Sequence, residues 1–128
     1  MTRLLKPFLL YCLPVLFYLA LILGLSSISN LPFRLSPGLH LDKVVHFFEY
    51  AILAFLVARA VAAMSWPAQG WAIWLVSSLL VLAVGCADEC YQSIVPNRSS
   101  ELLDLLADGL GGMVGSGLYL FFRFRFRG

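Results

Sequence analysis

The 128-residue chain has little charge: 12% of its residues are Asp, Glu, Lys or Arg, whereas 61% are hydrophobic. Soluble domains typically carry about 25% charged and about 45 to 50% apolar residues. The mean hydropathy of +0.89 agrees with this shortage of charge. Composition therefore excludes a soluble globular domain and predicts an integral membrane protein.

Other absences narrow the class of function. The three cysteines, Cys12, Cys86 and Cys90, are odd in number and lie in apolar segments, which excludes a disulfide framework. The basic residues gather at the two ends of the chain, and no basic stripe with interleaved aromatics spans a face, so no nucleic acid is expected as a partner. The interleaved Arg and Phe residues 123–127 indicate an interfacial anchor. The sequence has no phosphate loop, nucleophile elbow, metalloprotease motif or internal repeat. Any chemistry must come from individual polar side chains.

Four apolar runs are long enough to cross a bilayer. About 20 residues at 1.5 Å rise span the roughly 30 Å hydrocarbon core. The runs cover about residues 4–28, 42–64, 71–94 and 101–122. The first is longer than the apolar region of a signal peptide, which is about 7 to 15 residues, so it is a retained span. The sequence predicts an all-α, four-helix transmembrane bundle that forms one domain over residues 1–128.

Two positions predict local details. Pro14 lies inside the first run, where a kink is tolerated if a neighbouring helix or water satisfies the carbonyl that loses its donor. Ser100 is placed to cap the fourth helix, and Asp104 lies in its first turns, where the helix dipole favours an acid.

The distribution of basic residues predicts the orientation. Four crossings place both termini on one side, which carries most of the basic residues: Arg3, Lys6, Arg59, Arg123, Arg125 and Arg127. The opposite loops carry Arg34, Lys43 and Arg98. By the positive-inside bias the termini are cytoplasmic, and the loops after the first and third spans face outward.

The few acids are concentrated, and five of the seven lie between Asp88 and Asp108. An ionisable group at the centre of a membrane helix costs about 2.5 to 3.5 kcal/mol by insertion scales, so such a concentration needs a reason. The polar residues of the last three spans recur three or four apart near the outward ends: Asp42, Lys43, His46, Glu49 and Tyr50; Asp88, Glu89 and Gln92; Asp104 and Asp108. That spacing places Asp42, His46 and Glu49 or Tyr50 on one face of their helix, and likewise Asp88 with Gln92 and Asp104 with Asp108, while Glu89 lies one position round from Asp88. We expect one polar pocket open to the outer side, with Gly111 and Gly115 allowing close helix packing.

These residues resemble the VanZ-like membrane protein family over about residues 42–117. The resemblance is carried by Asp42-Lys43-x-x-His46-x-x-x-Tyr50, Asp88-Glu89-x-x-Gln92, Arg98 and Asp104-x-x-x-Asp108-x-x-Gly111-x-x-x-Gly115. It implies a small multi-span protein of the bacterial inner membrane, in a family associated with teicoplanin resistance in some Gram-positive bacteria. Two positions depart from the family pattern: Asp108, where Asn is common, and Asn97, where Gly is common.

Nine residues are the candidate site. His46, Asp88, Glu89 and Asp104 are the candidate catalytic residues, because a His near carboxylates can act as acid or base or hold a divalent metal. The candidate binding residues are Lys43, Tyr50, Gln92, Arg98 and Asp108. Among them, Lys43 and Arg98 are suited to a phosphate or carboxylate.

Three functions stay open at this point. In the first, the pocket binds a lipid headgroup, a lipid-linked cell-wall precursor or a glycopeptide antibiotic without turnover. In the second, the protein is an intramembrane hydrolase or transferase acting on a lipid-linked phosphate. In the third, the protein is a structural partner for a larger complex, and the polar residues form ion pairs that only fix the bundle. The concentration of His, Arg and several acids on one site favours an enzyme, whereas the lack of a dedicated nucleophile favours binding.

Overall fold

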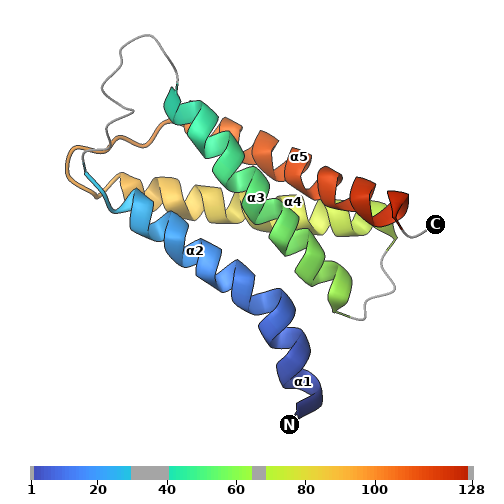
Figure 1. The fold of residues 1–128 in the computed structure, drawn as a ribbon. Coiled ribbons are helices and arrows are strands. Elements are labelled where there is room, and N and C mark those ends of the chain that lie inside the picture. The colour runs from blue at the N-terminus through green and yellow to red at the C-terminus, as the bar shows by residue number, and fades with distance from the viewer. Residues whose placement is uncertain (1, 30–40, 65–68, 127–128) are drawn as a thin grey trace.

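The computed structural model describes residues 2–29, 41–64 and 69–126. Its elements, in chain order, are α1 (Thr2–Pro7), η1 (Phe8–Cys12), α2 (Leu13–Ser26), α3 (Leu41–Ala63), α4 (Gly70–Gln92) and α5 (Leu102–Arg125), as Figure 1 shows. No strand occurs in these three ranges. The all-α prediction is confirmed.

Four helices are long and apolar enough to cross a membrane. They cover Leu5–Ser26, Leu41–Ala63, Gly70–Gln92 and Leu102–Arg125. Each end lies within three residues of its predicted position, because a long apolar run bounded by turn residues leaves little freedom in where a span begins and ends.

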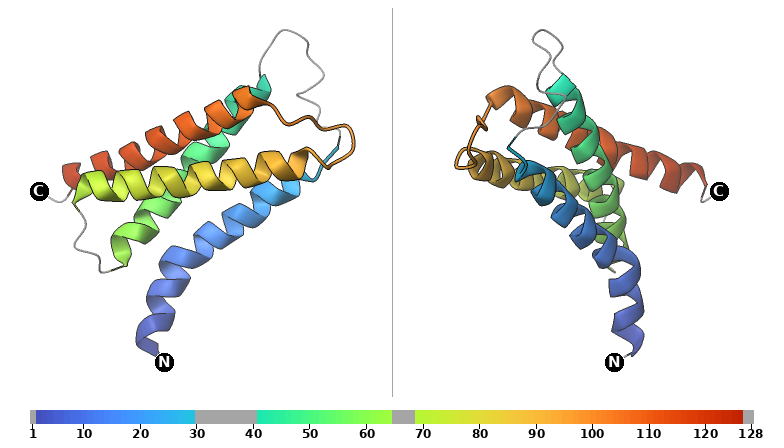
Figure 2. Two further views of the ribbon diagram at one scale, coloured as in Figure 1. Left: turned by 180° about the vertical axis from the view of Figure 1, so that it is seen from behind. Right: turned by 60° about the vertical axis from the view of Figure 1, so that its left-hand side comes forward.

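Helices α3, α4 and α5 pack most closely, and α2 lies against α3 and α4 while α1 diverges from the bundle (Figures 1 and 2). Gly111 and Gly115 set the distance between α5 and α3. A Cβ atom at either position would overlap the backbone of Phe47 or Ala51. The small buried core behind this contact is Ile22, Tyr50, Leu53, Ala54 and Val81.

The first span is π-helical rather than α-helical just before Pro14. Residues Phe8–Cys12 form a π-helical turn, in which the Leu13 N–H donates to the Phe8 carbonyl. Pro14 has no N–H for the Leu10 carbonyl four residues earlier. The Arg59 guanidinium on α3 donates to that carbonyl at 2.5 Å. A neighbouring helix therefore satisfies the carbonyl that Pro14 leaves without a helical donor, as the sequence predicted.

The ends of α2 and α4 and the beginnings of α3 and α5 meet at one end of the bundle, which we call the polar end (Figure 1). The described ends of the chain lie away from it (Figure 2). Arg34 and Arg127, which entered the charge comparison, lie outside the described residues. The cytoplasmic position of the termini stays a prediction.

The predicted Ser100 cap is wrong. The N-cap residue of α5 is Glu101, in extended conformation, and no side chain caps the helix. The Glu101 N–H instead donates to the Glu89 carboxylate at 3.0 Å. An acid from α4 thus binds the backbone at the entry to α5, which spacing within the loop could not reveal.

Candidate functional site

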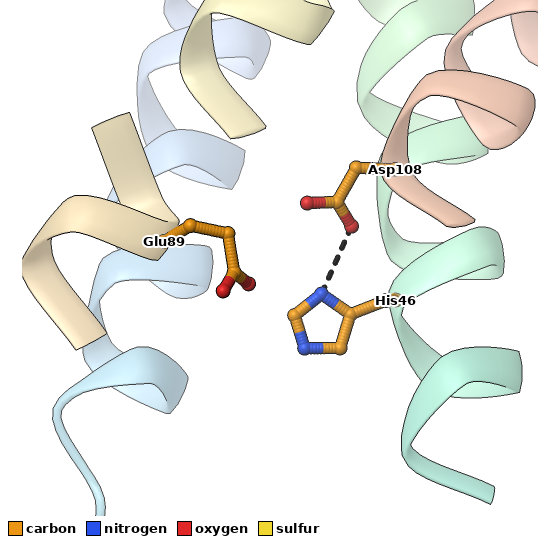
Figure 3. A group of neighbouring side chains, drawn as sticks. All are labelled: His46, Glu89 and Asp108. Carbon is orange, nitrogen blue, oxygen red and sulfur yellow. Dashed lines mark hydrogen bonds and ion pairs between the residues drawn. The ribbon is translucent and has the colours of Figure 1, made fainter. Parts of the chain in front are cut away.

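Three buried side chains from three helices form the inner cluster: His46 on α3, Glu89 on α4 and Asp108 on α5 (Figure 3). His46 Nδ1 lies 2.9 Å from Asp108 Oδ1. One ligand atom of each residue lies within 4.8 Å of the others. Figure 3 shows the Glu89 carboxylate turned toward the imidazole ring. The structure therefore brings the predicted His and two predicted acids together in a site buried between three helices.

Glycine on α4 makes room for Asp108. A Cβ atom at Gly85 would lie 3.0 Å from Asp108 Oδ2, so a larger side chain there would displace this carboxylate. Gly85 is one turn before Glu89, which places the acid of α5 against the same face of α4. Small residues that permit this approach are typical of membrane helix interfaces.

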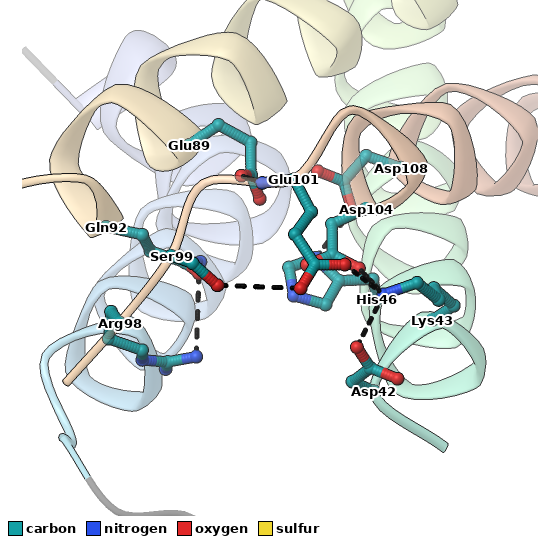
Figure 4. A network of polar contacts seen from close by, with 10 residues as sticks. All are labelled: Asp42, Lys43, His46, Glu89, Gln92, Arg98, Ser99, Glu101, Asp104 and Asp108. Carbon is teal, nitrogen blue, oxygen red and sulfur yellow. Dashed lines mark hydrogen bonds and ion pairs between the residues drawn. The ribbon is translucent and has the colours of Figure 1, made fainter. Parts of the chain in front are cut away.

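Lys43 is the centre of a second group, the rim cluster, with Asp42, Glu101 and Asp104 (Figure 4). Its Nζ lies 2.6 Å from Asp42, 2.7 Å from Glu101 and 2.9 Å from Asp104. Asp104 is almost fully buried, whereas Glu101 is half exposed. The ammonium has three donors, and all three are directed to acids of the chain itself.

Glu101 connects the two clusters. Its backbone N–H binds Glu89 of the inner cluster, and its side chain accepts from Lys43 of the rim cluster. The hydrogen bond from Lys43 holds the pKa of the Glu101 carboxyl below its usual value. Glu101 therefore stays ionised, and the beginning of α5 is tied to both α3 and α4.

Three further candidates, Asp88, Gln92 and Arg98, connect α4 and the loop after it to α2 by hydrogen bonds. Gln92 donates to Asp88 at 2.8 Å and to Ser26 at 3.3 Å. Arg98 donates to the Leu25 carbonyl at 2.8 Å and lies 3.5 Å from the Gln92 side-chain oxygen. These contacts attach the end of α2 to the polar end.

Asn97 explains how Arg98 is positioned. Asn97 has φ of 61°, in the left-handed region where Gly is favoured and Asn is tolerated better than most residues. The turn is closed by the Arg98 N–H, which donates to the Val95 carbonyl at 3.2 Å. Asn97 therefore keeps a turn whose backbone conformation favours glycine.

Two polar residues of α3, Glu49 and Tyr50, lie about one turn after His46. The Tyr50 ring is fully buried and lies parallel to the His46 ring at 6.3 Å between centroids. Glu49 is half-buried and lies three residues after His46 on the same face, but it is not among the nine candidate residues that the sequence predicts. One Glu49 carboxylate oxygen is buried without a hydrogen-bond partner among the described residues.

The polar end is rich in negative charge. All seven acids of the chain lie there: Asp42, Glu49, Asp88, Glu89, Glu101, Asp104 and Asp108. Among the described residues of this end, Lys43 and Arg98 are the permanently charged cations. In the other half of the bundle the buried polar side chains that the structure describes are Ser77 and Ser116.

An apolar groove approaches the polar end between α2, α3 and α4. Its volume is about 380 Å³, and Leu53, Val57 and Val81 are among the side chains that line it. A second cavity of about 220 Å³ shares Leu19 and Val84 with the groove and extends to Asp88 and Tyr91. The two cavities therefore lie next to each other, and the second is lined in part by the acid that Gln92 binds.

Comparison with known proteins identifies the family. A family model described as VanZ/LLP1 matches residues 8–123, which include α2, α3, α4 and all but the last two residues of α5. No match is found among curated proteins or among solved structures.

Proposed function

Because the chain belongs to the VanZ/LLP1 family, which is linked to teicoplanin resistance, we propose that it acts on an amphiphile of the bacterial cell envelope at the polar end. The substrate class is a lipid-linked phosphate in the bacterial inner membrane, and the reaction is transfer of the phosphoryl group to water or another acceptor. The observation that carries the proposal is the buried His46–Asp108 pair, at 2.9 Å, beside Glu89.

The pair is suited to proton transfer. With Asp108 accepting from Nδ1–H, the imidazole is held in one tautomer, and Nε2 is left to accept a proton. In hydrolysis, Nε2 would take the proton of water as the water oxygen bonds to phosphorus. The bond from phosphorus to the lipid oxygen breaks, and that oxygen receives a proton from the site. A positioned acid or base of this kind contributes about 10² to 10⁴ in rate.

The apolar groove supports an amphiphile as the substrate. A hydrocarbon chain lying between α2 and the α3–α4 pair would occupy the groove at Leu19 and Val84. Its polar head would lie toward Asp88, the residue before Glu89 of the inner cluster. Burial of apolar surface would hold the chain, while the polar end would select the head.

Binding without turnover is the second candidate, with a cell-wall precursor or a glycopeptide as the ligand. It is favoured by the position of the thiols, because Cys86 and Cys90 on α4 are both exposed, so neither is a nucleophile of the inner cluster. Lys43 and Arg98 also already hold partners within the chain, as a rigid recognition surface would.

Phosphate release and ligand binding by purified protein test both candidates. The probes are a polyprenyl diphosphate, phosphatidate and teicoplanin, with wild type, His46→Gln, Asp108→Asn and the distant control Ser77→Ala. We expect phosphate release to fall at least about 100-fold in the first two variants, with their unfolding temperature and ligand binding retained, and to be unchanged in the control. Binding without release in the wild type supports the second candidate. Neither binding nor release for any probe contradicts both.

A further inference from the structure

We propose that the inner cluster holds a divalent transition-metal ion, Zn²⁺ or Mn²⁺, with His46, Glu89 and Asp108 as its ligands. This inference rests on the proposed function in that it names the cofactor of the same site. It goes beyond that function because it changes the role of His46. A ring nitrogen that binds the ion has no free lone pair for a proton, so the ion would supply the base by lowering the pKa of water bound to it.

The ligand set and its spacing fit such an ion. Imidazole favours transition metals over Ca²⁺ and Mg²⁺, and carboxylate oxygens complete sites for Zn²⁺ and Mn²⁺. Ligand atoms about 2.0 to 2.2 Å from an ion lie at most about 4.4 Å apart. The three donors here lie within 4.8 Å of one another, so small side-chain rotations bring them into range.

Two buried oxygens of the cluster have no donor among the described residues. They are Glu89 Oε1 and Asp108 Oδ2, and both side chains are more than nine-tenths buried. Figure 3 shows these carboxylates approaching the imidazole from opposite helices. A buried carboxylate oxygen without a partner is costly, and a metal ion between the helices would satisfy it.

A comparison with the rim cluster strengthens the inference. The structure brings two groups of three ligating residues together, the inner cluster and Asp42, Glu101 and Asp104. The second group is built around the Lys43 ammonium, which is its cation. For Glu89 and Asp108 the described residues supply no ion pair with Lys or Arg, and Asp108 pairs with His46.

The balance of charge points the same way. Once Lys43 is assigned to its three acids, four carboxyl groups remain at the polar end: Glu49, Asp88, Glu89 and Asp108. Against them stand Arg98 and His46. The Lys43 group keeps two negative charges as well, since three acids surround one ammonium. With His46 protonated and every carboxyl group ionised, the excess at the polar end would be four negative charges, of which a divalent ion would offset two. The ion would also give an anionic phosphate a partner in a site that otherwise repels it.

Metal binding by the purified full chain tests the inference without any amphiphile. Protein stripped with a chelator is dialysed against Zn²⁺, Mn²⁺, Mg²⁺ or Ca²⁺, and bound metal and unfolding temperature are measured. We expect a single Zn²⁺ or Mn²⁺ per chain and a higher unfolding temperature with that metal. Glu89→Gln and Asp108→Asn keep the side-chain shape and should each weaken binding about tenfold or more. The matched rim variant Asp42→Asn should bind as the wild type does.

Three results would overturn the inference: no bound metal at micromolar concentrations, equal binding by the inner-cluster variants and wild type, or loss of binding in Asp42→Asn alone. The first would mean that protons neutralise the inner acids. Failure of the two proposals is distinguishable. Metal uptake without phosphate release or ligand binding contradicts the proposed function alone, whereas phosphate release by fully stripped protein contradicts the metal alone.

Discussion

At the scale of single residues, Lys43 carries the largest concentration of ionic contacts in the part of the chain that the structure describes. Its ammonium binds Asp42, Glu101 and the buried Asp104, which joins α3 to α5. We expect Lys43→Met to lower the free energy of unfolding by about 3 kcal/mol, because removing one partner leaves Asp104 buried and unpaired. Denaturant unfolding of the purified protein in detergent measures this.

A second variant isolates the cause of that loss. Adding Asp104→Asn to Lys43→Met removes the unpaired charge and should restore part of the lost stability. The exposed Lys6 is the control, and Lys6→Met should leave stability unchanged. Equal stability of Lys43→Met and wild type would show that the rim cluster is not held by this ion pair.

Residue spacing could predict which side chains share a helix face, but not which pairs form between helices. Positions three or four apart put Asp104 and Asp108 on one side of α5. The pair of Asp88 with Gln92, four apart on α4, follows from that spacing. The pairing of Asp108 with His46 depends instead on how far each helix rotates against its neighbours. That rotation is set by packing along the whole interface, which single-helix periodicity does not contain.

At the scale of helices, the contact of α5 with α3 depends on two glycines. A Cβ at Gly115 would overlap the backbone of Ala51, which cannot move without displacing α3. Gly115→Ala should therefore lower the free energy of unfolding by about 1 to 3 kcal/mol, as overpacking does. Gly117→Ala is the matched control on the same helix, because its Cβ would lie 3.8 Å from Trp74, an ordinary contact.

Unfolding of both glycine variants under the same conditions is the measurement. If Gly117→Ala destabilises the protein as much as Gly115→Ala, helix α5 is sensitive to any added methyl group, and the close approach to α3 is not the reason. If neither does, α3 and α5 separate more easily than their packing indicates.

Helix existence and length could be predicted from the sequence, whereas the details at helix ends could not. Apolar runs fix the four spans because a bilayer of set thickness requires them. The π-helical turn at Phe8–Cys12 and the extended Glu101 N-cap depend on Arg59 and Glu89, which belong to other helices. The local sequence predicts that the Leu10 carbonyl needs a donor, and the fold shows that Arg59 is that donor.

At the scale of the whole molecule, orientation decides which leaflet supplies the substrate. The charge asymmetry predicts cytoplasmic termini, so the polar end would face outward. A variant with Cys12, Cys86 and Cys90 replaced by Ala provides a background for single cysteines at Ser99, in the loop before α5, and at the exposed Phe126. In intact spheroplasts, a membrane-impermeant maleimide should label Ser99→Cys, whereas Phe126→Cys should need permeabilisation. The reverse pattern would place all seven acids at the cytoplasmic face. The proposed amphiphile would then have to come from the inner leaflet, and an extracellular glycopeptide could not reach the site.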